Sequence, residues 1–382
     1  TVPNRVITTT DPETGEVVQT VEDENPLSRF NPTYNVEGSL SGPIPGLGNN
    51  LTFFVNGRYY QNEGHLYGRE WFTPQGNPGD SSLVPMNPNQ RNSLQTKLTW
   101  RVLPGLKLSY NAFWNNYHSE RSFAKDWKYV PESRPQSFGY STTHILSMNH
   151  VLSQNTFYEV KLNRFSNSSE SYLYEDPFAS PRYLVSVPED TLNGIEAHIV
   201  DINTPEGQAA LEALRQDRIQ FNYIIDPTGP AGYVHPDSNS APTSYSFNNV
   251  GTANNRFSRS TAYWLGKFDI TSQINDIHQL KGGFEYRGYE LKLDSYTIRP
   301  AVDAEGGEQI VPFQPGIPPT SSTYHDKYNR KPMELSAYLQ DKMELKEIIV
   351  NMGVRFDYFD ANHVSIADPD DPNIYTPLKA SN

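Results

Sequence analysis

The chain has no cysteine in its 382 residues, so disulfide bridges and cysteine-ligated metal sites are both excluded. Long hydrophobic runs are missing as well. The longest, such as LTFF at 51–54, fall far short of the roughly 18 to 20 apolar residues that a membrane-spanning helix needs. Mean hydropathy is -0.65 and only 36% of the residues are hydrophobic. A helical membrane protein is therefore excluded.

Positive charge is also scarce. The formal net charge of -13 argues against a nucleic-acid partner, because phosphate binding needs a basic surface. Aromatic residues, by contrast, reach 12% of the chain, with 24 Tyr and 18 Phe. Many tyrosines together with Asn, Ser and Thr are typical of a β-barrel, whose spanning strands are polar on one face.

Hydrophobic and polar residues alternate along much of the chain. In LKLSYNAFWNNY (106–117), Leu106, Leu108, Tyr110 and Trp114 share one phase, and the other phase is mainly polar. This alternation places the apolar groups on one face of a strand. The run at 93–102 alternates in the same way and is separated from 106–117 by three residues, Leu103 to Gly105. The two runs therefore predict a tight hairpin.

The same pairing of strands recurs along the sequence and predicts an all-β, antiparallel transmembrane barrel with about ten strands. Segments 1–34 and 360–382 are expected to be extracellular loop segments on either side of a partial barrel at 35–359. The predicted strands are 35–42, 51–60, 93–102, 106–117, 138–152, 156–165, 261–273, 279–291, 333–344 and 348–359.

Short and long connections alternate between these strands. The long ones cover roughly 61–92, 118–137, 166–260 and 292–332, and the largest contains a predicted surface helix at 204–217 with Thr204 as its N-cap. Tight periplasmic turns and extended extracellular loops are typical of outer-membrane barrels. A soluble β-sandwich also alternates, but its loops are expected to be more nearly equal in length.

Both ends of the chain are expected on the extracellular side. Ten strands with two free edges cannot stay open in lipid, where each unpaired backbone group costs several kcal/mol. Either these strands close on themselves or further strands lie beyond both ends, and the external position of the ends favours further strands.

Several hairpins resemble those of TonB-dependent receptors, in particular the large Bacteroidetes-type, SusC-like members. The segments that carry the resemblance are 31–60, 268–287 and 334–362. The matching residues are Gly38, Gly42, Pro43, Pro45, Phe53, Phe54 and Gly57 in the first segment, and Tyr338, Gln340, Asp341, Gly353, Arg355 and Asp357 in the last. The resemblance covers most strand segments and few loops. It implies a 22-stranded barrel, of which these strands are about the second to the eleventh, together with a plug domain and a TonB box that this chain does not contain.

Charged residues fall on the polar phase of the predicted strands, which is expected to face the lumen. On the lipid face a Lys or Arg at the midplane would cost about 2 to 4 kcal/mol. A water-filled wall explains such charges more simply than contact with a plug. The lumen-facing candidates are Lys107, Glu159, Lys161, Lys267, Asp269, Glu285, Arg287, Arg355 and Asp357.

No motif for catalysis, phosphate binding or a helix-borne metal pair occurs, so neither an enzyme nor a cofactor is expected. The run ADPDDPN (367–373) offers Asp368, Asp370, Asp371 and Asn373 as oxygen ligands for calcium in an acidic extracellular loop. Its prolines and the missing central glycine depart from an EF-hand loop, and a solvated acidic loop is the simpler interpretation.

The leading functional hypothesis is an outer-membrane receptor or transporter that imports a bulky nutrient, such as a glycan, a peptide or a metal chelate. A passive porin and a structural or adhesive surface barrel are the alternatives. Outer-membrane lipids are expected partners, and the resemblance adds the TonB complex, the plug and a SusD-like lipoprotein. The aromatic loop residues that could contact an extracellular ligand are Tyr67, Trp71, Trp127 and Tyr233.

Overall fold

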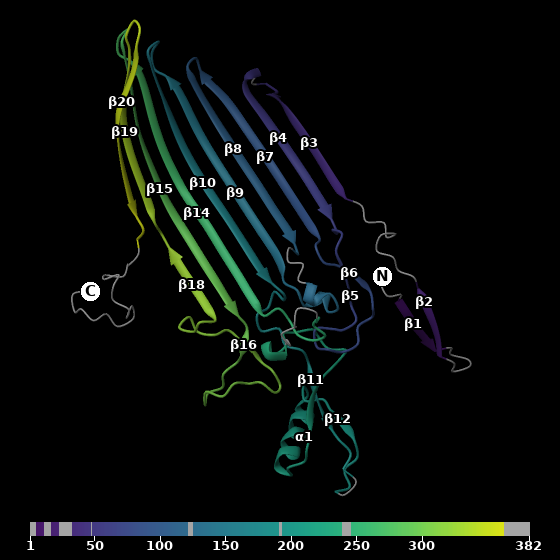
Figure 1. Cartoon of the computed structure of the whole chain (residues 1–382). Coiled ribbons are helices and arrows are strands. Elements are labelled where there is room, and N and C mark those ends of the chain that lie inside the picture. Colours follow the sequence, from purple (N-terminus) through teal and green to yellow (C-terminus); the bar gives the residue numbers. More distant parts are fainter. Residues whose placement is uncertain are drawn as a thin grey trace, which may run out of the picture.

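Ten long antiparallel strands and one short strand form a single sheet, which dominates the computed structural model (Figure 1). The structure describes residues 33–46, 48–120, 125–190, 193–238 and 246–362, and the backbone alone of 5–10 and 17–22. The long strands are β3 (Tyr34–Ile44), β4 (Gly48–Asn62), β7 (Asn89–Leu103), β8 (Leu106–Ser119), β9 (Gln136–Val151), β10 (Thr156–Tyr172), β14 (Asn255–Gln273), β15 (His278–Thr297), β19 (Met333–Glu344) and β20 (Ile349–Asp360).

The spatial order of these strands follows the chain, β3-β4-β7-β8-β9-β10-β14-β15-β19-β20, and every neighbouring pair is antiparallel. The prediction of an all-β antiparallel sheet of about ten strands is thereby confirmed. The sheet is open, because within the described part of the chain β3 pairs only with β4 and β20 only with β19.

All the short connections lie at one end of the sheet and all the long ones at the other (Figure 1). We call these the turn end and the loop end. Several strands run further towards the loop end than the alternation indicates. β10 continues to Tyr172 and β15 to Thr297, while β14 already begins at Asn255. In the β10 extension both faces are polar, as in SNSSES (166–171), so a hydrophobic period of two cannot reveal it.

The remaining strands are short and pair locally: β1 with β2 ahead of the sheet, and at the loop end β5 with β6, β16 with β17, and β18 with β15. Their bounds are β1 (Arg5–Thr10), β2 (Val17–Glu22), β5 (Tyr67–Arg69), β6 (Leu83–Pro85), β16 (Arg299–Pro300), β17 (Pro315–Gly316), β18 (His325–Arg330), and the 3-10 turns η1 (Lys125–Trp127), η2 (Pro131–Ser133) and η3 (Pro236–Ser238).

A separate ββαβ unit, which we call the loop subdomain, projects from the connection between β10 and β14 (Figure 1). It consists of β11 (Tyr183–Val187), β12 (His198–Val200), α1 (Pro205–Gln216) and β13 (Asn222–Ile225). The predicted helix is confirmed, since the Thr204 hydroxyl accepts a hydrogen bond from the Gly207 N–H at 3.0 Å and so caps α1. Val185, Val187, Ile202, Leu211 and Leu214 form its buried core.

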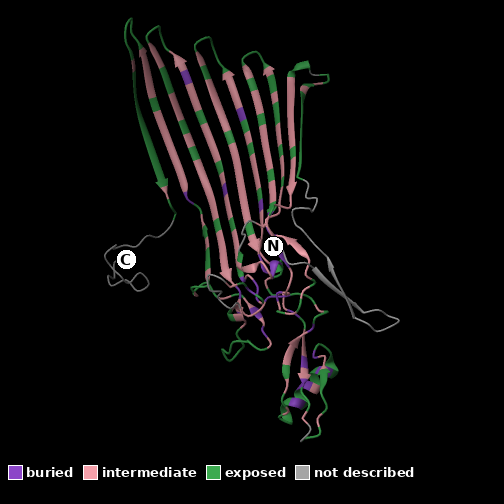
Figure 2. Ribbon diagram, turned by 45° about the vertical axis from the view of Figure 1, so that its right-hand side comes forward, coloured by how far each residue is buried: buried purple, intermediate pink, exposed green. Residues whose placement is uncertain are grey.

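Buried residues concentrate at the loop end and in the loop subdomain, whereas the sheet is mostly half-buried or exposed (Figure 2). A second small core at the loop end consists of Tyr233, Ile298 and Phe313. No helix in the described part of the chain has the length and apolar character needed to cross a membrane. The packed cores of this chain are therefore in its loops, and they hold the loop end together as one assembly.

Candidate functional site

The pairing register places all nine predicted lumen-facing residues on one face of the sheet. Residues directly opposite each other in antiparallel strands point to the same side, so a chain of pairings defines a row of side chains on one face. The first row contains Lys107, Glu159, Asp269 and Arg355, the second Lys161, Lys267, Glu285 and Asp357, and the third Arg287. We call this side the charged face.

The charges on this face pair with each other along their own strands. Nζ of Lys161 lies 3.1 Å from Oε1 of Glu159, and Nζ of Lys267 lies 3.2 Å from Oδ2 of Asp269. Pairs of the same kind join Arg287 to Glu285 at 2.9 Å and Arg355 to Asp357 at 2.8 Å. Because opposite charges alternate, the wall is polar without carrying a strong net field.

Aromatic rings interrupt the charged face, a feature that the sequence interpretation missed. The Tyr338 ring lies over Gly283, where any β-carbon would collide with it, and its hydroxyl donates to Asp269 at 2.5 Å. Nearer the loop end, Phe165 stacks on Tyr263 with ring centroids 5.1 Å apart. These rings occupy the same alternate positions of their strands as the charged residues. Extending the alternation along each strand would therefore have predicted that they lie on the charged face.

The opposite side, which we call the apolar face, exposes large hydrophobic side chains. Leu162 is 50% exposed, Phe356 61% and Val354 74%. One row across the sheet consists of Trp100, Leu108, Met148, Val160, Phe268, Phe284, Ala337 and Phe356. No second sheet covers this face within the described residues, so the side chains meet whatever surrounds the protein.

Several ionisable residues lie on the apolar face, among them Asp341 and Arg164. Asp341 lies opposite Leu280 and Met352, close to the turn end, and its carboxylate pairs with Nδ1 of His278 at 2.7 Å. Arg164 lies opposite Trp264 and stacks its guanidinium over the indole at 5.1 Å. A cation on a lipid-facing strand costs about 2 to 4 kcal/mol at the midplane but only about 0 to 1 near the interfaces.

At the loop end the charged face is hollowed between β4, β7 and β8. Arg58, Ser93 and Asn115 form one row of this hollow, and Tyr60, Arg91 and Tyr117 form the next. The space measures about 640 Å³, which is within the usual range for small-molecule sites. Two guanidiniums and two phenols beside an open volume can bind a ligand that carries acidic or hydroxyl groups. These residues were not among the predicted site residues.

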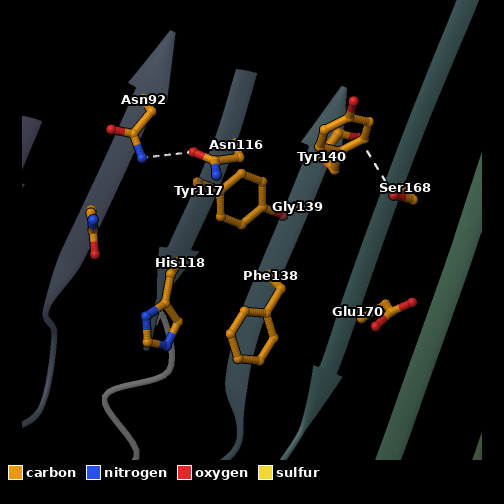
Figure 3. A pocket seen from close by; sticks show the side chains of 10 residues that line it. Asn92, Asn116, Tyr117, His118, Phe138, Gly139, Tyr140, Ser168 and Glu170 are labelled. Atoms are coloured by element: carbon orange, nitrogen blue, oxygen red, sulfur yellow. Dashed lines mark hydrogen bonds between the residues drawn. The ribbon is translucent and has the colours of Figure 1, made fainter. Parts of the chain in front are cut away.

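A second hollow lies on the apolar face beyond its hydrophobic rows (Figure 3). Asn92, Asn116, Tyr140 and Ser168 form one row of it. The Asn92 amide donates to Asn116 at 2.8 Å, and the His118 and Phe138 rings stack at 4.7 Å in the next row (Figure 3). The same face is thus apolar over its middle and polar at the loop end.

The loops above the sheet are joined by buried polar contacts. The Arg134 side chain, which is almost fully buried, donates to the carbonyl oxygens of Met86 at 2.6 Å and Pro131 at 2.9 Å, and pairs with Glu120 at 2.5 Å. Ser133 Oγ donates to the Gly251 carbonyl at 2.6 Å. Three connections far apart in sequence are therefore held in one assembly.

The four predicted ligand-contact residues lie in different surroundings. Trp71 stacks flat on Tyr129 with ring centroids 4.2 Å apart, and Tyr67 and Trp127 are half-buried in β5 and η1. Tyr233 is fully buried in the core with Ile298 and Phe313. Its ring therefore packs the loop assembly and offers no open surface to a ligand, in contrast to the expectation from sequence.

No group of three or more potential metal-ligating carboxylates and histidines occurs within the described ranges. The suggested calcium run at 367–373, with Asp368, Asp370, Asp371 and Asn373, lies outside the described residues. One loop carboxyl is unusual: burial, with Glu132 and Asp80 nearby, raises the pKa of the Glu70 carboxyl to about 7.

No protein-family model and no curated protein sequence matches the chain. Solved structures with a similar arrangement include the outer membrane transporter YddB from Escherichia coli (11% identity, TM-score 0.48, 86% of this chain and 34% of that one). The ferripyoverdine receptor of the outer membrane of Pseudomonas aeruginosa (10%, 0.46, 90% and 39%) and the ferric-catecholate import receptor Fiu from E. coli K12 in its closed form (9%, 0.42, 91% and 43%) are others. The chain spans well under half the length of each of these proteins.

Proposed function

We propose that this chain is part of the wall of an outer-membrane β-barrel receptor of the TonB-dependent kind, which imports a bulky nutrient. The observation that carries the proposal is the two-sided sheet, with exposed Leu162, Val354 and Phe356 on one face and paired charges on the other. Lipid would cover the apolar face, and the charged face would line an aqueous interior.

The two free edges support a larger barrel. In lipid, the unpaired N–H and C=O groups of β3 and β20 would each cost several kcal/mol. Further strands of the parent protein would satisfy them, in agreement with the 22-stranded barrel that the sequence resemblance implies. The plug domain and the TonB box would belong to the same parent protein.

The hollow between Arg58, Arg91 and Tyr117 is the proposed ligand-contacting part of the wall. It lies on the interior side, directly below the assembled loops, where an incoming solute would first meet the barrel. A glycan, a peptide or a metal chelate all carry the oxygen atoms that guanidinium and phenol donors recognise. A SusD-like lipoprotein seated on the loop end is the partner that the Bacteroidetes-type resemblance adds.

Labelling of the two faces tests the membrane assignment. Because the chain has no cysteine, Leu162→Cys and Asn163→Cys each introduce a single thiol into it, on opposite faces of β10. Spin labels at these two sites, in the full-length protein in vesicles, should differ in which relaxation reagent reaches them. The Leu162→Cys label should be accessible to oxygen and the Asn163→Cys label to a water-soluble nickel chelate. Equal access of the nickel chelate to both labels would contradict the proposal.

Measuring nutrient uptake by intact cells distinguishes the three functional hypotheses, which are a receptor, a passive porin and a structural barrel. We expect a gene deletion to abolish uptake of one bulky nutrient, and loss of TonB to have the same effect. Uptake that survives loss of TonB would indicate a passive porin, and no uptake defect on any nutrient would indicate a structural barrel. Arg58→Ala combined with Arg91→Ala should weaken uptake at low nutrient concentration, whereas Lys97→Ala, elsewhere on the charged face, serves as the matched control.

A further inference from the structure

Arg164 occupies the point on β10 where the apolar face ends. Towards the turn end this face carries Tyr158, Val160 and Leu162, and towards the loop end it carries Ser166 and Ser168. On the neighbouring strands, too, the side chains of this face change from apolar to polar in the same region. On β14 the exposed apolar series ends at Trp264, which is 60% exposed and lies opposite Arg164. The cation therefore lies on a boundary that several strands share.

The length of the strand places this boundary at the outer side of the membrane, if the proposed function is right. Arg164 lies eight residues beyond Thr156, the first residue of β10. At about 3.4 Å per residue and a tilt of about 40°, it is roughly 20 Å above the turn end. A barrel's apolar band is about 25 Å tall, so the Arg164 backbone lies just inside its outer edge on the loop side, and the long side chain can reach the lipid headgroups.

The Arg164 guanidinium stacks over the Trp264 indole, and within the described residues no hydrogen bond or ion pair joins it to another side chain. Glu290, one row further on β15, is near enough to interact with its charge, but that carboxylate is paired with Lys292 at 2.9 Å. His144, opposite Arg164 on β9, bonds through Nδ1 to the Tyr110 hydroxyl at 2.8 Å. Five N–H donors at the edge of lipid thus remain available to an acceptor from outside the chain.

We propose that Arg164 and Trp264 form a binding site on the outer wall for the phosphate group of a lipid in the outer leaflet. The guanidinium matches a phosphate in charge and in its forked geometry. Trp264 fixes the orientation of the guanidinium and packs against the lipid at the interface, where indole rings are favoured. The Ser166 hydroxyl, two residues along on the same face, adds a donor towards the headgroup.

The experiment measures lipid binding to the detergent-purified full-length protein by native mass spectrometry, with bis-phosphorylated lipid A as the probe. Arg164→Gln should raise the apparent Kd for lipid A at least about tenfold, the usual scale for a charge-assisted hydrogen bond. Arg164→Lys should retain part of the affinity, since it keeps the charge without the fork. Lys161→Gln removes a cation from the other face of β10 and should change nothing.

Two further arms identify what is recognised. Lipid A without its phosphates should bind the unaltered protein as weakly as intact lipid A binds the Arg164→Gln variant. Millimolar inorganic phosphate should not displace lipid A, and full displacement would show a free-phosphate site and overturn the lipid assignment. Equal lipid A binding by Arg164→Gln and the unaltered protein also overturns the proposal. If that result came with face labelling that supports the barrel, the proposed function would stand and only this site would fall.

Discussion

The sheet and the loop assembly are stabilised in different ways. The sheet is held by backbone ladders between neighbouring strands, and its large apolar side chains, such as Leu162 and Phe356, are exposed on one face. The loop assembly buries Tyr233, Ile298 and Phe313 inside itself and joins its segments through buried hydrogen bonds from Ser133 and Arg134. The loops therefore resemble a small water-soluble protein, while the sheet depends on its surroundings for the burial of its apolar face.

This difference indicates how each region should respond to change. A substitution in the loop assembly removes contacts within the chain, so its effect should be local and independent of lipid. A substitution in the sheet alters contacts with the medium, so its effect should depend on which face it occupies. If the proposed function is right, that difference between the faces should appear only in a membrane. The following predictions use matched substitutions in the two regions.

The largest effect is expected for Arg134→Ala in the loop assembly. Removal of this buried guanidinium leaves Glu120 and the carbonyl oxygens of Met86 and Pro131 without their donor. Breaking a buried pair costs about 3 to 5 kcal/mol. Hydrogen exchange of the amides at 67–86 and 125–134 should accelerate strongly. Arg215→Ala, which removes an exposed ion pair with Glu212 on α1, should cost at most about 1 kcal/mol. Similar losses for both variants would contradict the role of Arg134 in joining the loops.

The next largest effect is expected for Leu162→Arg on the apolar face. A cation at this position should destabilise the full-length protein in phospholipid vesicles by about 2 to 4 kcal/mol. Asn163→Arg, one residue further along β10, places the same cation on the charged face and should have little effect. Denaturant unfolding followed by tryptophan fluorescence measures both. The comparison between faces fails if the two arginines cost the same.

Thr204→Ala should have a smaller effect, confined to the loop subdomain. It removes the hydroxyl that accepts from the Gly207 N–H, and loss of an N-cap costs about 1 kcal/mol. Thr204→Ser keeps the oxygen and is the matched control. Hydrogen exchange along α1 should increase in the alanine variant alone, and any change in the strands of the sheet would argue against an independently packed unit.

The smallest effect is expected from the titration of Glu70, which is partly exposed. Its raised pKa of about 7 means that the folded loops bind this proton more tightly than the unfolded chain does, whose value is 4.5. Loop stability should therefore be highest below about pH 4.5, decline between the two values, and stay constant above pH 7. Glu70→Gln should flatten that decline in the exchange rates of the neighbouring amides. A decline that persists in the variant would assign it to other groups.

The sequence predicted the sheet where its two faces differ in polarity and missed it where they do not. LKLSYNAFWNNY alternates because its two faces differ in polarity, so the face that each side chain occupies could be predicted directly. SNSSES (166–171) is equally regular as a strand but polar on both sides, and it was assigned to a loop. The loop subdomain was visible only through α1, because β12 and β13 have three and four residues.

The face on which the site residues lie could be predicted from the sequence, but the full set of residues in the site could not. All nine expected charges lie on one face, since alternation alone fixes that. Arg91 is in phase with Lys97 on β7 but falls in the segment 61–92, which the sequence predicts to be a loop. Arg58 falls in the predicted strand 51–60, but the row it joins depends on the pairing of β4 with β7. The burial of Tyr233 could not be inferred, because it depends on Ile298 and Phe313, which are distant in the sequence.

The loop subdomain enters and leaves the fold at almost the same place, because Tyr183 and Ile225 are direct partners on β11 and β13. Directly opposite residues of antiparallel strands are only about 5 Å apart. An insertion with such closely spaced ends could be removed or exchanged for another without changing the span that the remaining chain must cover. Related proteins could therefore carry a different domain at this position while keeping the same sheet beneath it.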